Sequence, residues 1–180
     1  DVTFTSLPTE KFHIDYPGQI SAKIWGRGGD GTVGANKNAI TIIGLDADKY
    51  AQVYFAYDSM KTGGLTQSHL RFGDKPIHAT YLVGAADFVG CHAPTYVKKY
   101  DTTTDLKDGG VYLLNCPWSV EELDKELPAQ MKKDLYNKHA QFYIIDATKL
   151  AGEIGLGDRV NSILQAAFFK LTNVIPIDEA

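Results

Sequence analysis

The feature that most constrains the fold of this chain is a glycine-rich segment, GRGGDG at 26–31, that separates two stretches of different character. The run Gln19–Trp25 before it is short and apolar, which is typical of a buried strand. The stretch Thr32–Ile43 after it has helical periodicity and stops at Gly44. Its apolar residues at helical spacing are Val33, Ile40 and Ile43. The sequence therefore predicts a strand, a glycine loop and a helix.

The same alternation continues along the chain and decides the fold class. Further strands are expected at 51–57, 65–72, 86–91, 111–115 and 142–145. Helices are expected at 94–106, after Ser119, after Pro128, after Asp146 and at 160–171. Parallel neighbours need crossover connections, so we predict a Rossmann-like α/β fold of three layers: a mostly parallel sheet with helices on both faces.

Size and composition are those of one globular domain. The chain has 180 residues, 44% of them hydrophobic, and we predict a single domain over 1–180. Its formal charge of -4 argues against nucleic acid or an anionic membrane as a partner. No apolar run approaches the ~18 residues that cross a bilayer, so the expected location is cytoplasmic. The start at Asp1 suggests a fragment of a longer chain.

The glycine loop is a candidate anion site. Free backbone N–H groups at a helix start, together with the positive end of the helix dipole, attract phosphate, and glycines allow close approach. Coenzyme A, a dinucleotide or a nucleotide would fit, and so would a loop that merely packs tightly. GRGGDG also satisfies G-x-G-x-x-G with Asp58 at the end of the second strand, which keeps NAD as a rival. A P-loop fails because Gly34 is followed by Ala-Asn-Lys.

The sequence contains no clear candidate for a catalytic site. The two cysteines, Cys91 and Cys116, form no CxxC pair, so neither an iron–sulfur cluster nor a zinc site is expected here. The histidines at 69, 78 and 92 have no metal-ligand spacing. A thiamine diphosphate site is rejected because no Asn-Asn pair follows Gly29–Gly31. We therefore predict no catalytic and no metal-binding residues.

Two further residues are candidates for ligand contact. Lys61 lies in the flexible loop 58–64 and could place an ammonium on a phosphate, or be an ordinary solvated lysine. Asn161 begins the last helix just after a glycine break at 155–157, where capping and ligand contact are equally plausible.

Several strings in combination resemble the gamma domain of pyruvate:ferredoxin or flavodoxin oxidoreductases, and they cover nearly the whole chain. They are GRGGDGTVGANKNAITIIG, YFAYDSMKTGGLTQSHLRFG, ADFVGCH, GGVYLLNCPWS and FYIIDATKLAGEIGLGDRVNSILQAAFFKL. The resemblance implies a multidomain enzyme that turns pyruvate and coenzyme A into acetyl-coenzyme A and CO2 while it reduces ferredoxin or flavodoxin. It also implies that thiamine diphosphate, Mg²⁺ and [4Fe–4S] clusters lie on other domains, and that the parent enzyme is a homodimer.

The resemblance makes this domain the coenzyme A holder, and not a catalyst by itself. Lys61 and Asn161 lie in family strings tied to that ligand, although Met60 stands where a second lysine is expected. Asp30 would repel phosphate, so it is expected to shape the loop or to contact the adenosine and ribose. The loop residues expected at the coenzyme A site are Gly28, Gly29, Asp30, Gly31 and Thr32. The alternatives are an NAD-dependent dehydrogenase domain and an architectural subunit without a ligand.

Overall fold

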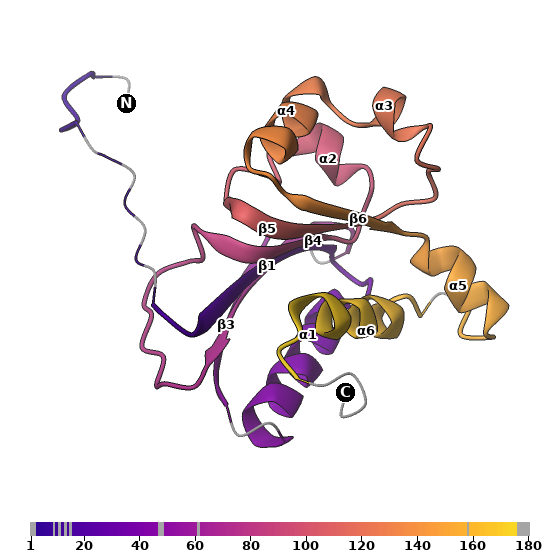
Figure 1. The fold of residues 1–180 in the computed structure, drawn as a ribbon, viewed down its shortest axis with the longest axis horizontal. Coiled ribbons are helices and arrows are strands. Elements are labelled where there is room, and N and C mark those ends of the chain that lie inside the picture. Colours follow the sequence, from indigo (N-terminus) through magenta and orange to yellow (C-terminus); the bar gives the residue numbers. More distant parts are fainter. Residues whose placement is uncertain are drawn as a thin grey trace.

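The structure is a computed structural model that describes residues 3–8, 10, 12, 14, 16–46, 49–60, 62–157 and 159–175. Strands and helices alternate along most of it (Figure 1). The strands are β1 (Gln19–Arg27), β2 (Tyr50–Tyr57), β3 (Leu65–Gly73), β4 (Ala86–Cys91), β5 (Leu106–Asn115) and β6 (Gln141–Ile145). The helices are α1 (Thr32–Thr41), α2 (Tyr96–Lys99), α3 (Leu123–Glu126), α4 (Ala129–Asn137), α5 (Ala147–Glu153) and α6 (Asn161–Thr172), with a π-helical turn η1 (Ile42–Asp46) after α1.

The strands form one sheet in the order β2-β3-β1-β4-β5-β6. β1 pairs in parallel with β4, β4 with β5, and β5 with β6. β3 runs antiparallel to both of its neighbours, β2 and β1. The predicted mostly parallel sheet is confirmed, and the loop 58–64 replaces a crossover helix because antiparallel strands need only a short connection.

Helices cover both faces of the sheet, which confirms the three layers (Figure 1). α1 and α6 pack on one face over a core that includes Ile24, Leu70 and Phe168. On the opposite face, α2 and α4 cover a second core over β4, β5 and β6 that includes Val89 and Leu114. β1 lies at the centre, so its two ends are positions where loops from both faces meet.

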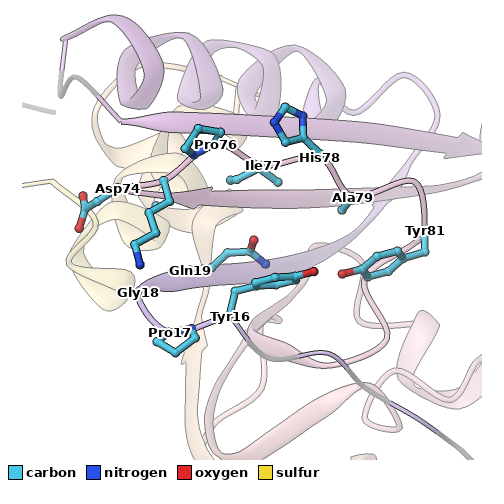
Figure 2. Close-up of a pocket in the computed structure, with 12 residues that line it drawn as sticks. Tyr16, Pro17, Gly18, Gln19, Asp74, Pro76, Ile77, His78, Ala79 and Tyr81 are labelled. Atoms are coloured by element: carbon cyan, nitrogen blue, oxygen red, sulfur yellow. The ribbon is translucent and has the colours of Figure 1, made fainter.

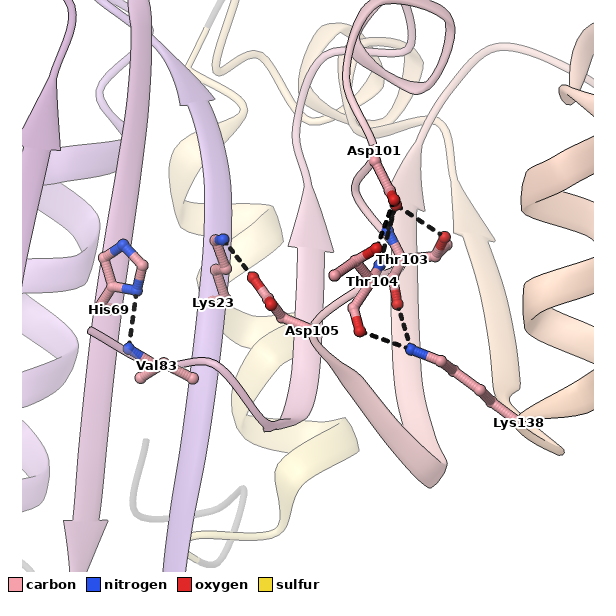
Figure 3. Close-up of polar contacts among 8 residues, drawn as sticks. All are labelled: Lys23, His69, Val83, Asp101, Thr103, Thr104, Asp105 and Lys138. Atoms are coloured by element: carbon pink, nitrogen blue, oxygen red, sulfur yellow. Dashed lines mark hydrogen bonds and ion pairs between the residues drawn. The ribbon is translucent and has the colours of Figure 1, made fainter. Parts of the chain in front are cut away.

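Two predicted boundaries are wrong for local reasons. The helix expected over 94–106 is only α2, because the turn after it is closed by Asp101, which accepts hydrogen bonds from the amides of Thr103 at 3.1 Å and Thr104 at 2.9 Å (Figure 3). The second boundary concerns Gly109-Gly110, a pair that the sequence predicts to be a turn before the strand at 111–115 but that lies inside β5. Gly109 adopts a φ of 70°, and the β4–β5 pairing shifts register before Phe88, so these glycines permit a bulge and not a turn.

The inward face of α1 also differs from the prediction. The residues it buries include Ala35, Ala39 and, in the following turn, Ile43, whereas Val33 is only partly buried. The helical period was recognised correctly, but small alanines pack against the sheet where larger residues were expected. The close packing leaves Val33 beside the glycine loop.

Candidate functional site

The glycine loop follows β1 directly and leads into the first turn of α1. Gly29 and Gly31 have φ values of 94° and 84°, a conformation that other residues adopt only with strain. Asp30 holds the loop together, because its carboxylate accepts hydrogen bonds at 2.8 Å from the backbone N–H groups of Arg27 and Thr32. Both carboxylate oxygens of Asp30 therefore shape the loop, as one of the two expected roles for it requires.

The loop borders a depression of about 570 Å³, here called the glycine-loop depression. Among the described residues none accepts a hydrogen bond from the amides of Val33 and Gly34, which line this depression. Such free amides, at the positive end of a helix of ten residues, are a favourable environment for an anion. The predicted site residues on its wall are Gly28, Gly29, Asp30 and Gly31.

A second loop fixes the other wall of the glycine-loop depression. The amide of Gly28 donates to the carbonyl of Gly64 at 2.8 Å, and the amide of Gly63 donates to the carbonyl of Gly28 at 2.9 Å. The segment 58–64 that carries Lys61 is thus tied to the glycine loop by its backbone. Lys61 itself lies outside the described residues.

Thr32 and Asn161 have different surroundings. The side chain of Thr32 is buried, its hydroxyl lies 2.8 Å from Nδ1 of His92, and its amide donates to Asp30, so both groups are engaged within the protein. Asn161 meets the glycine loop at the start of α6, because a Cβ added to Gly31 would lie 3.2 Å from its Cγ. The structure therefore brings the starts of α1 and α6 together, although Asn161 does not line the glycine-loop depression.

A second depression, of about 590 Å³, opens at the ends of β1, β4 and β5 and is called the switch-point depression. The connection after β1 leads to α1 on one face, and that after β4 leads to α2 on the other. This divergence is the topological switch point where open α/β sheets bind ligands. Its wall includes Arg27, Asp30, His92, Lys99, Asn115 and Thr148.

Arg27 and Lys99 are exposed cations at this edge that the sequence analysis did not select. Arg27 lines both depressions, and its place inside GRGGDG was an available signal. Lys99 lies far from the loop in sequence and reaches it only through the parallel β1–β4 pairing. Arg27 thus adds positive charge to both depressions, and Lys99 adds it to the switch-point depression.

His92 is a neutral element of the same edge. Burial lowers its pKa to about 4, against a smaller opposing effect of the Asp30 carboxylate. The backbone carbonyl of His92 also accepts a hydrogen bond at 3.0 Å from the Asn115 side chain, whose oxygen accepts from the amide of Ala147 at 3.1 Å. This chain of contacts fixes the ends of β4 and β5 relative to α5.

Asp58 lies where the NAD alternative requires an acidic residue in the sequence, but the strand that it follows has the wrong place in the sheet. It follows β2 and lines the glycine-loop depression. In a dinucleotide-binding fold, however, the acidic residue follows a parallel neighbour of the first strand. Here β3 lies between β2 and β1 and runs antiparallel to both.

The environment of the two cysteine thiols does not favour the reactive thiolate form. Cys91 and Cys116 are free and buried, and burial raises the pKa of Cys91 to about 12. Over the described ranges, no three or more His, Cys, Asp or Glu side chains gather as a metal site would need. The same ranges contain no helix that is long and apolar enough to span a membrane.

Comparison with known proteins gives a consistent result. The sequence matches the family described as pyruvate ferredoxin/flavodoxin oxidoreductase over residues 21–180. It is 56% identical to the pyruvate:ferredoxin oxidoreductase of Moorella thermoacetica, over all of this chain and 16% of that protein. The chain thus spans about a sixth of the length of this curated relative.

Two solved structures share the fold at low sequence identity. The gamma subunit of a keto/oxoacid ferredoxin oxidoreductase from Geobacter sulfurreducens has a TM-score of 0.65 at 20% identity, over 89% of this chain and 81% of that one. A 2-oxoglutarate:ferredoxin oxidoreductase from Magnetococcus marinus, with 2-oxoglutarate, coenzyme A and succinyl-CoA bound, has a TM-score of 0.64 at 17% identity, over 87% of this chain and 25% of that one.

Proposed function

Because this chain belongs to the pyruvate ferredoxin/flavodoxin oxidoreductase family, we propose that it is the coenzyme A-binding, gamma-type domain of such an enzyme. The parent enzyme would convert pyruvate and coenzyme A to acetyl-coenzyme A and CO2 and reduce ferredoxin or flavodoxin. The domain 1–180 would work with other domains of a cytoplasmic homodimer, and would not catalyse the reaction by itself.

The observation that carries this proposal is the free anion-binding surface at the start of α1. Val33 and Gly34 line the glycine-loop depression, and their amides are unpaired among the described residues. Coenzyme A carries a diphosphate, and phosphates bind helix N-termini through such amides. Arg27, at the boundary of both depressions, adds a cation suited to bidentate phosphate contact.

The proposed role of this domain is binding and positioning. Gly28, Gly29 and Gly31 would let the diphosphate approach the backbone, Asp30 would hold the loop, and Lys61 and Asn161 would complete the contacts. An anchored diphosphate restricts where the distal thiol can go, which raises its effective concentration at a reaction centre on a neighbouring domain. Thr32 would contribute indirectly, by holding the loop, since its amide donates to Asp30 and its hydroxyl is engaged by His92.

The cofactors that the family implies belong elsewhere in the parent enzyme under this proposal. Thiamine diphosphate with Mg²⁺ would supply the decarboxylation chemistry, and [4Fe–4S] clusters would carry the electrons. A [4Fe–4S] cluster needs four thiolate ligands, whereas this chain has two cysteines, both buried in the core over β4 and β5. The donor set of this domain therefore does not fit a cluster.

A glycine-to-alanine pair in the full-length enzyme tests the proposal. Gly34→Ala places a methyl group on the depression without a steric contact inside the protein, since nothing lies within 4 Å of the added Cβ. The replacement should stabilise α1 by about 0.5–1 kcal/mol while it obstructs the phosphate. We expect the Kd for coenzyme A, measured by titration calorimetry, to rise at least about tenfold.

The matched control is Gly152→Ala, which also adds a methyl group to a helix with nothing within 4 Å and lies on neither depression. Its Kd for coenzyme A should be unchanged. NAD and ADP are titrated alongside. Tight NAD binding without a response to coenzyme A would reverse the assignment in favour of the dehydrogenase alternative, and equal coenzyme A affinity in both variants would exclude the α1 start as the phosphate site.

A further inference from the structure

The strand β2 forms an edge of the sheet, and its sequence is unusual for that position. Among the described strands it pairs only with β3, without a register shift from Tyr50–Gly73 to Tyr57–Thr66. Edge strands are normally interrupted by charged residues, prolines or bulges, or are short. The eight residues of β2, YAQVYFAY, contain no charge and no proline, whereas β6 at the opposite edge has only five residues. A long, regular and uncharged strand therefore lies at this edge.

Half of the β2 backbone points away from β3. The amide of Asp58 donates to the carbonyl of Leu65 at 2.9 Å, which identifies these two residues as a hydrogen-bonded pair. Such pairs recur at every second residue of an antiparallel ladder, so the even-numbered residues of β2 face β3. The N–H and C=O groups of the odd-numbered residues point outward, and no other described residue forms a hydrogen bond with them. These outward-facing residues are Ala51, Val53, Phe55 and Tyr57.

Aromatic side chains lie beside this edge on both faces of the sheet. Tyr50 and Tyr54 are 51% and 58% exposed on one face, and Tyr57, which is 61% exposed, lies on the other. Tyrosine is enriched at protein interfaces because its rigid ring buries a large contact area at low cost in side-chain entropy. The edge thus combines free backbone groups with aromatic rings that a docked segment would cover.

The two faces of β2 already have neighbours within this chain. Figure 2 shows the segment from Asp74 to Tyr81 passing over one face of the sheet, and the Ala79 carbonyl of this segment accepts a hydrogen bond at 3.0 Å from the side chain of Gln52. On the opposite face, β2 packs against the core that α1 and α6 cover. In the part of the chain that the structure describes, the side of β2 that lacks a neighbour is therefore its outer edge.

The remainder of the enzyme is the partner that this edge fits. The chain covers 16% of the Moorella thermoacetica relative, so most of a polypeptide of that length lies outside this domain. A segment tethered to the domain has an effective concentration on the order of millimolar, which favours it over a separate protein. The edge has no charge, and a charged side chain docked there would lose water without gaining an ion pair. The matching segment therefore carries uncharged side chains along the contact.

We propose that an extended segment of the parent polypeptide, outside residues 1–180, pairs with β2 and adds a seventh strand to the sheet. Its backbone satisfies the outward N–H and C=O groups, as strand addition does at other exposed sheet edges. Its side chains pack beside Tyr50 and Tyr54. Because β2 leads directly into the segment 58–64, the added strand also anchors one wall of the glycine-loop depression. This inference does not depend on coenzyme A binding.

Amide hydrogen exchange of the full-length enzyme, resolved to single amides over residues 49–58, tests the pairing. We expect the outward amides of Ala51, Val53 and Phe55 to exchange at least about a hundredfold more slowly than in an unstructured peptide. The amides of Gln52 and Tyr54 face β3 and are protected in either case, so they are the internal control. Outward amides that exchange at the unstructured rate, beside a protected Gln52 and Tyr54, would overturn the proposal.

A photo-reactive residue identifies the segment that lies on this edge. In the full-length enzyme p-benzoylphenylalanine replaces Tyr54, and the peptides cross-linked on irradiation are sequenced by mass spectrometry. The expected product joins β2 to a peptide of the parent polypeptide outside residues 1–180. A cross-link confined to residues 1–180, which includes β2 of a second copy, rejects the proposal, and so does a cross-link to a different protein or to none. The same replacement at Tyr136, which is 83% exposed on α4, measures the background.

A charge placed on the edge tests the same contact by a different route. Lysine is well tolerated on a bare edge strand, but in Tyr54→Lys it would be desolvated beside an added strand. We expect Tm of the full-length enzyme to fall and the outward amides of β2 to exchange at least about tenfold faster. Tyr136→Lys is the matched control and should change neither. Equal Tm and equal exchange in the two variants would contradict the added strand, and the exchange pattern of the unsubstituted enzyme decides the question even if Tyr54→Lys does not fold.

Discussion

Asp30 shows how one side chain can reconcile a negative charge with a phosphate site. The sequence suggested that it either shapes the loop or contacts a ribose, and both of its oxygens accept backbone hydrogen bonds at 2.8 Å. A carboxylate at a helix start is also favoured by the helix dipole. Its charge is thus partly neutralised within the loop, which leaves the amides of Val33 and Gly34 for another anion.

Asp30→Asn should therefore loosen the glycine loop. The amide has one acceptor oxygen, so one of the two backbone N–H groups would face an NH2 group instead. We expect local stability to fall by about 1–2 kcal/mol, seen as faster amide hydrogen exchange over residues 27–34 in the full-length enzyme. Asp58→Asn is the control, because the hydrogen bond that its carboxylate accepts among the described residues comes from the neighbouring Ser59 hydroxyl, at 3.3 Å, and not from the glycine-loop backbone. Equal exchange in both variants would contradict this role.

The connection between β1 and α1 depends on a close approach of strand and helix. A Cβ added at Gly26 would lie 2.7 Å from three side-chain atoms of Thr32. Thr32 cannot turn away easily, since it is fully buried and its hydroxyl is bonded to His92. The first glycine of GRGGDG is therefore required by packing, whereas Gly29 and Gly31 are required by their backbone conformation.

Gly26→Ala should force β1 and α1 apart, because the added methyl group would overlap the Thr32 side chain. Overpacking of this kind costs about 1–3 kcal/mol, so Tm of the full-length enzyme should fall and exchange should accelerate in β1 and α1. Gly152→Ala is again the matched control, with no neighbour within 4 Å of the added Cβ. A stability equal to the control would mean that Thr32 has room to move, and the required approach would be wrong.

At the level of elements, local sequence patterns correctly predicted where helices begin. Ser119 and Glu122 form a reciprocal cap, with the Ser119 amide 2.8 Å from the Glu122 carboxylate, and they precede the short helix α3. Pro128 immediately precedes α4, as its fixed φ favours. The bounds of β4 were predicted correctly as well. The helix predicted over 94–106 is wrong at its end, because no local pattern indicates that Leu106 already pairs with Ala86 of β4.

At the scale of the whole molecule, two histidines of the described part of the chain, His69 and His92, lie on opposite faces of the sheet and have lowered pKa values. Burial lowers the pKa of His69 to about 4, with Lys23 and Arg71 contributing, and burial lowers that of His92 to about 4. In the unfolded chain both titrate near 6.5. Below that pH the unfolded state binds more protons than the folded state, so folding stability decreases as pH falls.

We therefore expect stability to be flat above pH 6.5 with respect to these groups and to drop as pH falls from 6.5 toward 4. The slope is at most about 1.4 kcal/mol per pH unit for each histidine. Tm of the full-length enzyme at a series of pH values measures it, and His69→Gln should reduce the slope by removing one titrating group. An unchanged slope in that variant would show that His69 is not neutral in the folded state.

The sequence by itself determined the α/β class, the strand–glycine loop–helix unit and the family, because periodicity, glycine positions and long matching strings are local properties. Only the tertiary structure decided that β3 lies antiparallel between β2 and β1, and that Lys99 and Asn115 join the glycine loop at one edge. Strand order and the grouping of side chains at that edge arise from contacts between residues far apart in sequence, and no local pattern encodes them.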